Sequence, residues 1–111
     1  METLTTNTPA FVYDAAKKIQ QLIEKMSESK WTLELADEIM GASDIYAVLN
    51  SPFLYPTFEA MEKELIRRVA REAALQESSI YGDIATRRLR AMSEALNIYN
   101  QIKKEHVTAN N

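Results

Sequence analysis

The residues best suited to bind an anion or a partner are the six arginines, all of which lie between Arg67 and Arg90. Together with Lys63 they give the range 63–90 a net charge of +3, although the whole chain carries −3. Clustered guanidinium groups can bind phosphate, RNA or the carboxylates of a partner protein. Lys63, Arg67 and Arg71 are expected on the outer face of their helix without the i,i+4 acidic neighbours that pair the other arginines. They are the candidate partner-binding cations.

The alternative is that the arginines are neutralised within the protein itself. Each i,i+4 ion pair on a helix contributes only ~0.3–0.5 kcal/mol, but several such pairs would use up the basic charge. Four of them are predicted: Glu64–Arg68, Arg68–Glu72, Asp83–Arg87 and Arg90–Glu94. The densest acidic stretch lies elsewhere, at residues 28–44. We favour a neutralised, solvated face over a functional basic patch and keep both interpretations.

Glu72 and Arg88 are predicted to form a partly buried ion pair. Arg88 falls within the apolar arc of its own helix, and Glu72 falls within the apolar arc of the preceding one. If the two helices form a hairpin, these positions lie nearly opposite each other. A buried pair rarely adds net stability, so its expected role is to fix the register of the helices.

The segment 52–58 is unusually apolar for a connection between helices. Four of the nine aromatic residues fall within 13 residues: Tyr46, Phe53, Tyr55 and Phe58. Aromatic side chains dominate the energetics of protein interfaces. Phe53 and Tyr55 are therefore candidate partner-binding residues if they are exposed. The alternative is that this segment covers the core.

Catalytic and metal-binding chemistry has little support. The chain has no cysteine and a single histidine, His106, which excludes thiolate and multi-histidine sites. The sequence contains neither a glycine-rich phosphate loop nor a nucleophile elbow. We therefore expect a protein that is not an enzyme and has no catalytic, metal or cofactor site.

DNA binding by residues 31–50 is not favoured. This range is loosely similar to a helix-turn-helix, with Gly41 near the expected turn. A recognition helix needs basic or amide side chains against phosphate and base edges. Residues 31–49 contain no basic residue and four acidic ones, so a plain helical corner is the better interpretation.

Apolar spacing predicts an all-α fold, a small helical bundle with a long antiparallel C-terminal helical hairpin. Thr8 is a typical N-cap before Pro9, and Gly41 is expected to close a helix in a left-handed cap before Ser43 starts another. The expected helices span about 9–27, 31–41, 43–50, 57–77 and 83–104. Residues 9–105 are predicted to form a single domain between polar tails at 1–8 and 106–111.

The 4-3-4-3 spacing of apolar residues from Ala85 to Tyr99 suggests either internal core or a seam for a second copy. No apolar run approaches the ~18 residues of a membrane span, so no membrane partner is expected. We expect a cytoplasmic, non-enzymatic interaction module that acts as an adaptor, an inhibitor or a subunit of a larger, possibly homo-oligomeric assembly. The alternative is a nucleic-acid-associated factor that uses the arginine band 67–90.

Overall fold

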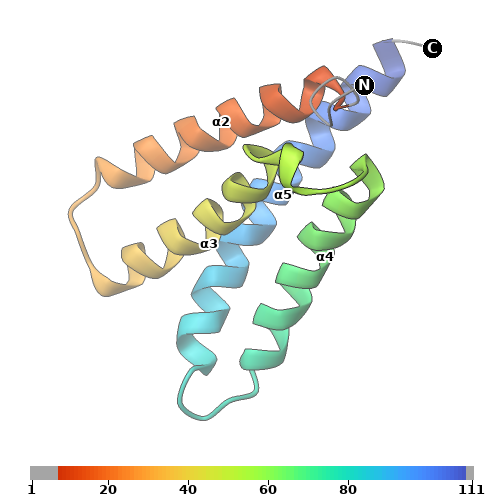
Figure 1. Ribbon diagram of the computed structural model, residues 1–111. Helices are drawn as coiled ribbons and strands as arrows, with labels where there is room; N and C mark the ends of the chain where they lie inside the picture. The colour runs from red at the N-terminus through yellow and green to blue at the C-terminus, as the bar shows by residue number, and fades with distance from the viewer. Residues whose placement is uncertain (1–7, 110–111) are drawn as a thin grey trace.

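The computed structural model describes residues 8–109, and within this range it contains four α-helices, one short 3-10 helix and no strand (Figure 1). The elements are α2 (Ala10–Ser27), α3 (Leu33–Leu49), η1 (Pro52–Leu54), α4 (Phe58–Leu75) and α5 (Gly82–Ala109). The helices pack together as a compact bundle. The predicted all-α fold class is therefore confirmed.

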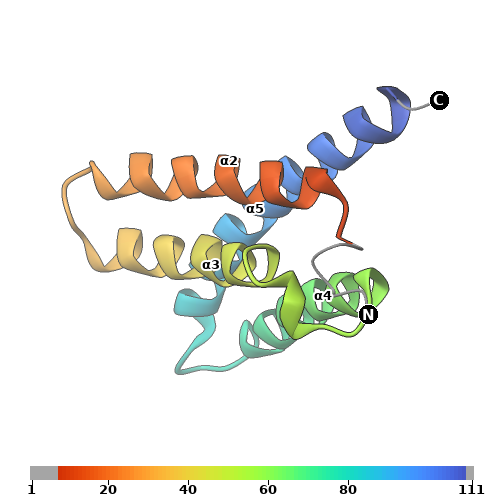
Figure 2. The same cartoon turned by 45° about the horizontal axis from the view of Figure 1, so that its top comes forward.

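The core lies where α5 crosses the other helices. Figures 1 and 2 both show α2 and α3 running side by side in opposite directions, with α5 passing across them. Each of the four helices contributes fully buried side chains, among them Ile19, Ile45, Met61 and Met92. Since each helix carries apolar side chains on its inner side, burying them requires contact with the others.

The α2 helix begins one residue later than the sequence pattern indicates. Pro9, rather than Thr8, occupies the N-cap position, and the Val12 N–H donates to the Pro9 carbonyl at 3.1 Å. The buried face of α2 includes Phe11, Val12 and Ile19, which recur at helical spacing. That spacing, rather than the cap, determines the helix.

The prediction of two short helices at 31–41 and 43–50 is wrong, because α3 is continuous from Leu33 to Leu49. The Thr32 hydroxyl caps its start by accepting from the Leu35 N–H at 3.0 Å. Gly41 does not adopt the left-handed conformation and lies fully inside the helix. A Cβ atom added to Gly41 would collide with the backbone of Arg88, because it would lie only 2.9 Å from the Arg88 Cα. Gly41 therefore permits the close approach of α3 to α5.

The last two helices differ from the expected boundaries at both ends. The Thr57 hydroxyl caps α4 by accepting from the Ala60 N–H at 3.0 Å, and α4 ends at Leu75, two residues before the predicted end. In the loop that connects α4 to α5, the Ser78 hydroxyl accepts from the N–H groups of Ile80 and Tyr81. The antiparallel hairpin stays a prediction, because α5 contacts α3 more extensively than it contacts α4.

The α5 helix extends to Ala109, five residues beyond the expected end. Of the predicted tails, residues 1–7 and 110–111 lie outside the described residues. His106, expected near a frayed end, lies in the helix with its ring centroid 5.1 Å from that of Phe11. No helix of the described range combines the length and apolar character that a bilayer crossing requires.

Candidate interaction surface

The connection between α3 and α4 is an ordered turn. The N–H groups of Leu54 and Tyr55 donate to the Ser51 and Pro52 carbonyls, each at 3.1 Å, and thereby form η1. Pro52 pre-sets the backbone angle for this turn and is itself buried. The turn therefore fixes the backbone that carries Phe53 and Leu54.

The two aromatic candidates of this segment have different environments. Phe53 is 58% exposed, and the adjacent Leu54, which sequence reasoning did not single out, is 66% exposed. Tyr55 is half-buried and packs against the core, as does Phe58, whose ring meets Phe11 edge-on at 5.9 Å. The segment thus partly covers the core, and partly presents the adjacent side chains of Phe53 and Leu54 to solvent.

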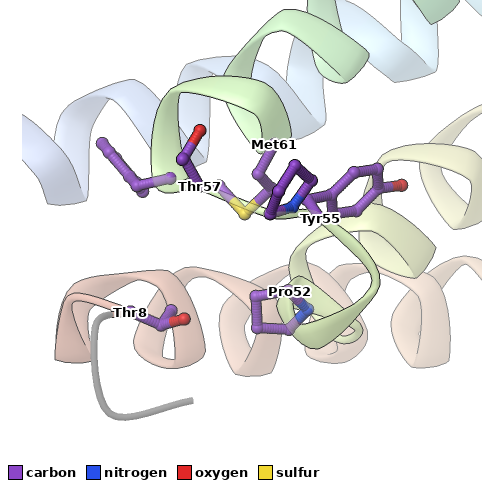
Figure 3. A pocket seen from close by; sticks show the side chains of 7 residues that line it. Thr8, Pro52, Tyr55, Thr57 and Met61 are labelled. Atoms are coloured by element: carbon purple, nitrogen blue, oxygen red, sulfur yellow. The ribbon is translucent and has the colours of Figure 1, made fainter. Parts of the chain in front are cut away.

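A small pocket of about 150 Å³ lies beneath this turn, between η1 and the start of α4. Figure 3 shows Thr8 and Pro52 on one side and Thr57, Met61 and Tyr55 on the other. Its lining is mostly apolar and carries no charged side chain. Among the described residues that line it there is thus no carboxylate, imidazole or amine side chain.

Most of the arginines contact carboxylates, but largely not those that the sequence spacing indicates. Of the four predicted i,i+4 pairs, the described residues form only Glu64–Arg68, at 2.8 Å. Three pairs instead connect α3 to other helices: Asp44–Arg68, Asp37–Arg87 at 2.8 Å and Glu38–Arg90 at 3.8 Å. The acidic face of α3 therefore lies against the arginine band.

Glu64 binds two arginines at once. Its carboxylate accepts from Arg67 at 2.6 and 2.7 Å and from Arg68 at 2.8 Å. These hydrogen bonds lower the pKa of Glu64 from 4.5 to about 2, and those from Arg67 have the larger effect. Arg67 has no acidic partner at i,i+4, as expected, but the i,i+3 position supplies Glu64.

Lys63, Arg67 and Arg71 are all exposed on this helix. Among residues 8–107, whose side chains the structure describes, Lys63 and Arg71 form no ion pair or hydrogen bond. Arg67 stays at the surface, but its charge is paired with Glu64.

Glu72 and Arg88 are brought together as the sequence predicts. Arg88 Nη1 lies 3.8 Å from Glu72 Oε1, and Glu72 is 7% exposed. Arg88 also approaches Met40, with Nη2 at 3.6 Å from the sulfur. Within the described part of the chain, Glu72 Oε2 and Arg88 Nε are buried without a hydrogen-bond partner. Both polar groups are therefore only partly satisfied.

A polar cluster between α4 and α5 was missed by sequence reasoning. Glu62 Oε2 accepts from the Tyr99 hydroxyl at 2.6 Å and from the Lys103 ammonium at 2.7 Å. Burial raises the pKa of Tyr99, and the Glu62 hydrogen bond and charge raise it further. The position of Glu62 within the apolar arc of its helix was the available signal. The cluster connects α4 to α5.

The remaining sequence candidates have structural roles. Of the seam on α5, Ala85, Met92 and Tyr99 are buried in the core, so these positions are not available to a second copy. The helix-turn-helix pattern has no turn at 41–43. Residues 8–107 contain no cluster of three or more side chains suited to a metal ion.

Comparison with protein-family models, curated proteins and solved structures finds no significant match. The function must therefore be inferred from the chain's own surfaces. Of these, the pair Phe53 and Leu54 combines large apolar side chains, high exposure and a fixed backbone. We call this pair the η1 surface.

Proposed function

We propose that the protein is a non-enzymatic interaction module that binds a partner protein through the η1 surface. The observation that carries this proposal is that Phe53 and Leu54 are 58% and 66% exposed on an ordered turn. Covering these side chains would remove apolar surface from water. The hydrogen-bonded turn already fixes their backbone, so binding loses less conformational entropy than it would for a flexible loop.

The composition of the η1 surface fits a protein partner better than a polyanion. An aromatic and an aliphatic side chain are typical of the central contacts of protein interfaces. The nucleic-acid alternative depends on the arginine band, and five of its six members contact carboxylates within the described residues. Retention of an oligonucleotide at low salt, lost steeply as salt rises, would revive that alternative.

The test is affinity capture from source extract with the full chain and two double variants. Phe53→Ser/Leu54→Ser removes the η1 surface. Ile80→Ser/Tyr81→Ser is the matched control, because it removes two adjacent side chains that are 76% and 54% exposed at another corner. We expect a partner that the wild type and the control retain and the η1 variant loses by about tenfold, which corresponds to ~1.4 kcal/mol.

Circular dichroism and light scattering accompany each capture. Unchanged helicity shows that a lost partner does not reflect unfolding. A mass that falls from dimer to monomer in the η1 variant alone would identify the partner as a second copy. Equal capture by all three proteins would refute the η1 surface as the binding site.

A further inference from the structure

A second surface, separate from the η1 surface, combines a groove with an unpaired arginine, Arg71. The groove has a volume of about 470 Å³ and lies between α3 and α4, with Arg88 of α5 contributing to its lining. Figure 1 shows α5 passing behind α3 and beside α4. Ile39 and Met40 supply an apolar wall, and Arg71 and Glu72 line the opposite side. Met40 is 51% exposed, so this wall is accessible to a ligand.

Of the four charged side chains that line the groove, Arg71 is the one without an ion-pair partner among the described residues. Asp44 is paired with Arg68, which lies outside the lining, and Glu72 is paired with Arg88. Arg71 is exposed, so its guanidinium can take a carboxylate of a ligand. A polyanion would also face Asp44 and Glu72.

Glu72 offers no contact to a ligand. Its side chain belongs to the groove lining but is more than nine-tenths buried, and its Oε2 atom is enclosed by the protein. The groove therefore offers one unpaired cation for a carboxylate, beside an apolar wall.

We propose that this groove binds an acidic segment of a partner protein. A carboxylate of the segment pairs with Arg71, and a neighbouring aliphatic side chain packs on Met40 and Ile39. Charge complementarity at Arg71 selects this occupant. The inference deepens the proposed interaction role by naming the chemistry of a partner, at a surface that shares no residue with the η1 surface.

The test is an NMR titration of the full chain with labelled methyl groups. The probe is a terminally blocked, alanine-rich peptide that carries one glutamate four residues after one leucine, and the control peptide has glutamine in place of glutamate. We expect saturable shifts at the methyl groups of Met40 and Ala47, which line the groove. The Arg71→Gln variant should bind about fivefold more weakly. Lys63→Gln, which removes another unpaired cation from the same helix, should bind as the wild type does.

Three results would overturn the inference: equal affinity for the glutamine peptide, equal affinity in the Arg71→Gln variant, or shifts confined to other surfaces. An oligonucleotide that displaces the peptide and shifts the same methyl groups more strongly would also overturn it, in favour of a nucleic-acid ligand. The Phe53→Ser/Leu54→Ser variant should bind the peptide unchanged. Failure of the groove and failure of the η1 surface are thus distinguishable.

Discussion

At the scale of single residues, five of the six arginines contact a carboxylate within the described residues. Glu64 contacts Arg67 and Arg68, and Glu72 contacts Arg88. An arginine that already donates to a carboxylate has less capacity for an external anion, because its donors and its charge are in use. Arg71 differs from these in having no such contact among residues 8–107, and so it is the arginine assigned to a partner.

Glu64→Gln should make the free energy of unfolding depend less on pH in the acidic range. Because two arginines depress its pKa from 4.5 to about 2, the ionised carboxylate stabilises the fold above the unfolded value. This contribution is lost as the pH falls from 4.5 towards 2. We expect urea unfolding to show that the variant has a free energy of unfolding about 1 kcal/mol below that of the wild type at neutral pH. The difference between the two proteins should shrink as the pH falls across this interval. The same loss in Glu24→Gln, an exposed carboxylate of α2, would contradict the assignment.

Arg88→Met should destabilise the protein by about 2–3 kcal/mol, because it removes the partner of a buried carboxylate. The double variant Glu72→Leu/Arg88→Met should recover most of this loss, since it removes both charges. Chemical unfolding of the two single variants and the double variant measures the coupling. If Arg88→Met were as stable as the wild type, Glu72 would not depend on this pair.

At the scale of elements, α3 shows how a helix can continue through residues that usually end one. Gly41 and Ser43 are typical of a helix boundary, but the helix crosses both because its backbone lies against α5 at Gly41. A larger residue at this crossing would push the two helices apart. It would thereby also break the ion pairs that Asp37 and Glu38 of α3 form with α5. Glycine is needed here for its lack of a side chain, not for an unusual backbone conformation.

Gly41→Ala should lower the free energy of unfolding by about 1–3 kcal/mol, because its Cβ would meet the Arg88 backbone. In an ordinary helix interior the same change stabilises by roughly 0.5–1 kcal/mol, so the sign of the effect is the decisive result. Thermal unfolding measured by circular dichroism provides it. Ser43→Ala, two residues further along α3, should change the free energy of unfolding by less than about 0.5 kcal/mol. A stabilised Gly41→Ala variant would refute the close approach.

At the scale of the whole molecule, the chain separates its charges along the sequence and recombines them in space. The acidic residues of α3 contact arginines of α4 and α5, so the bundle is held by polar contacts around an apolar centre. The centre draws side chains from all four described helices, including Ile19, Ile45, Met61 and Met92. Because each helix buries its apolar face against the others, we expect the bundle to unfold as one unit.

Met92→Ala should test this cooperativity. Met92 is fully buried, and its truncation should cost about 2–5 kcal/mol. Hydrogen exchange should show protection falling together in α2, α3, α4 and α5, whereas Ser93→Ala, at an exposed neighbouring position, should leave it unchanged. Loss of protection in α5 alone would show that the other helices fold independently of it.

The sequence by itself determined the helical class, the approximate place of each long helix and the approach of Glu72 to Arg88. These follow from apolar spacing, which is a local property: a stripe repeating every three to four residues can be buried only by a helix. The Thr32 and Thr57 caps are local in the same way, because each hydroxyl accepts from an N–H three residues ahead.

Only the tertiary structure decided that α3 is continuous, that Phe53 is exposed while Tyr55 is half-buried, and that Arg87 contacts Asp37 rather than Asp83. Each of these depends on which backbone lies opposite, and the partner can be far away in the sequence. Asp37 and Arg87 are 50 residues apart. A local pattern gives the direction in which a side chain points along its own helix, but its environment is set by the helices that pack against it.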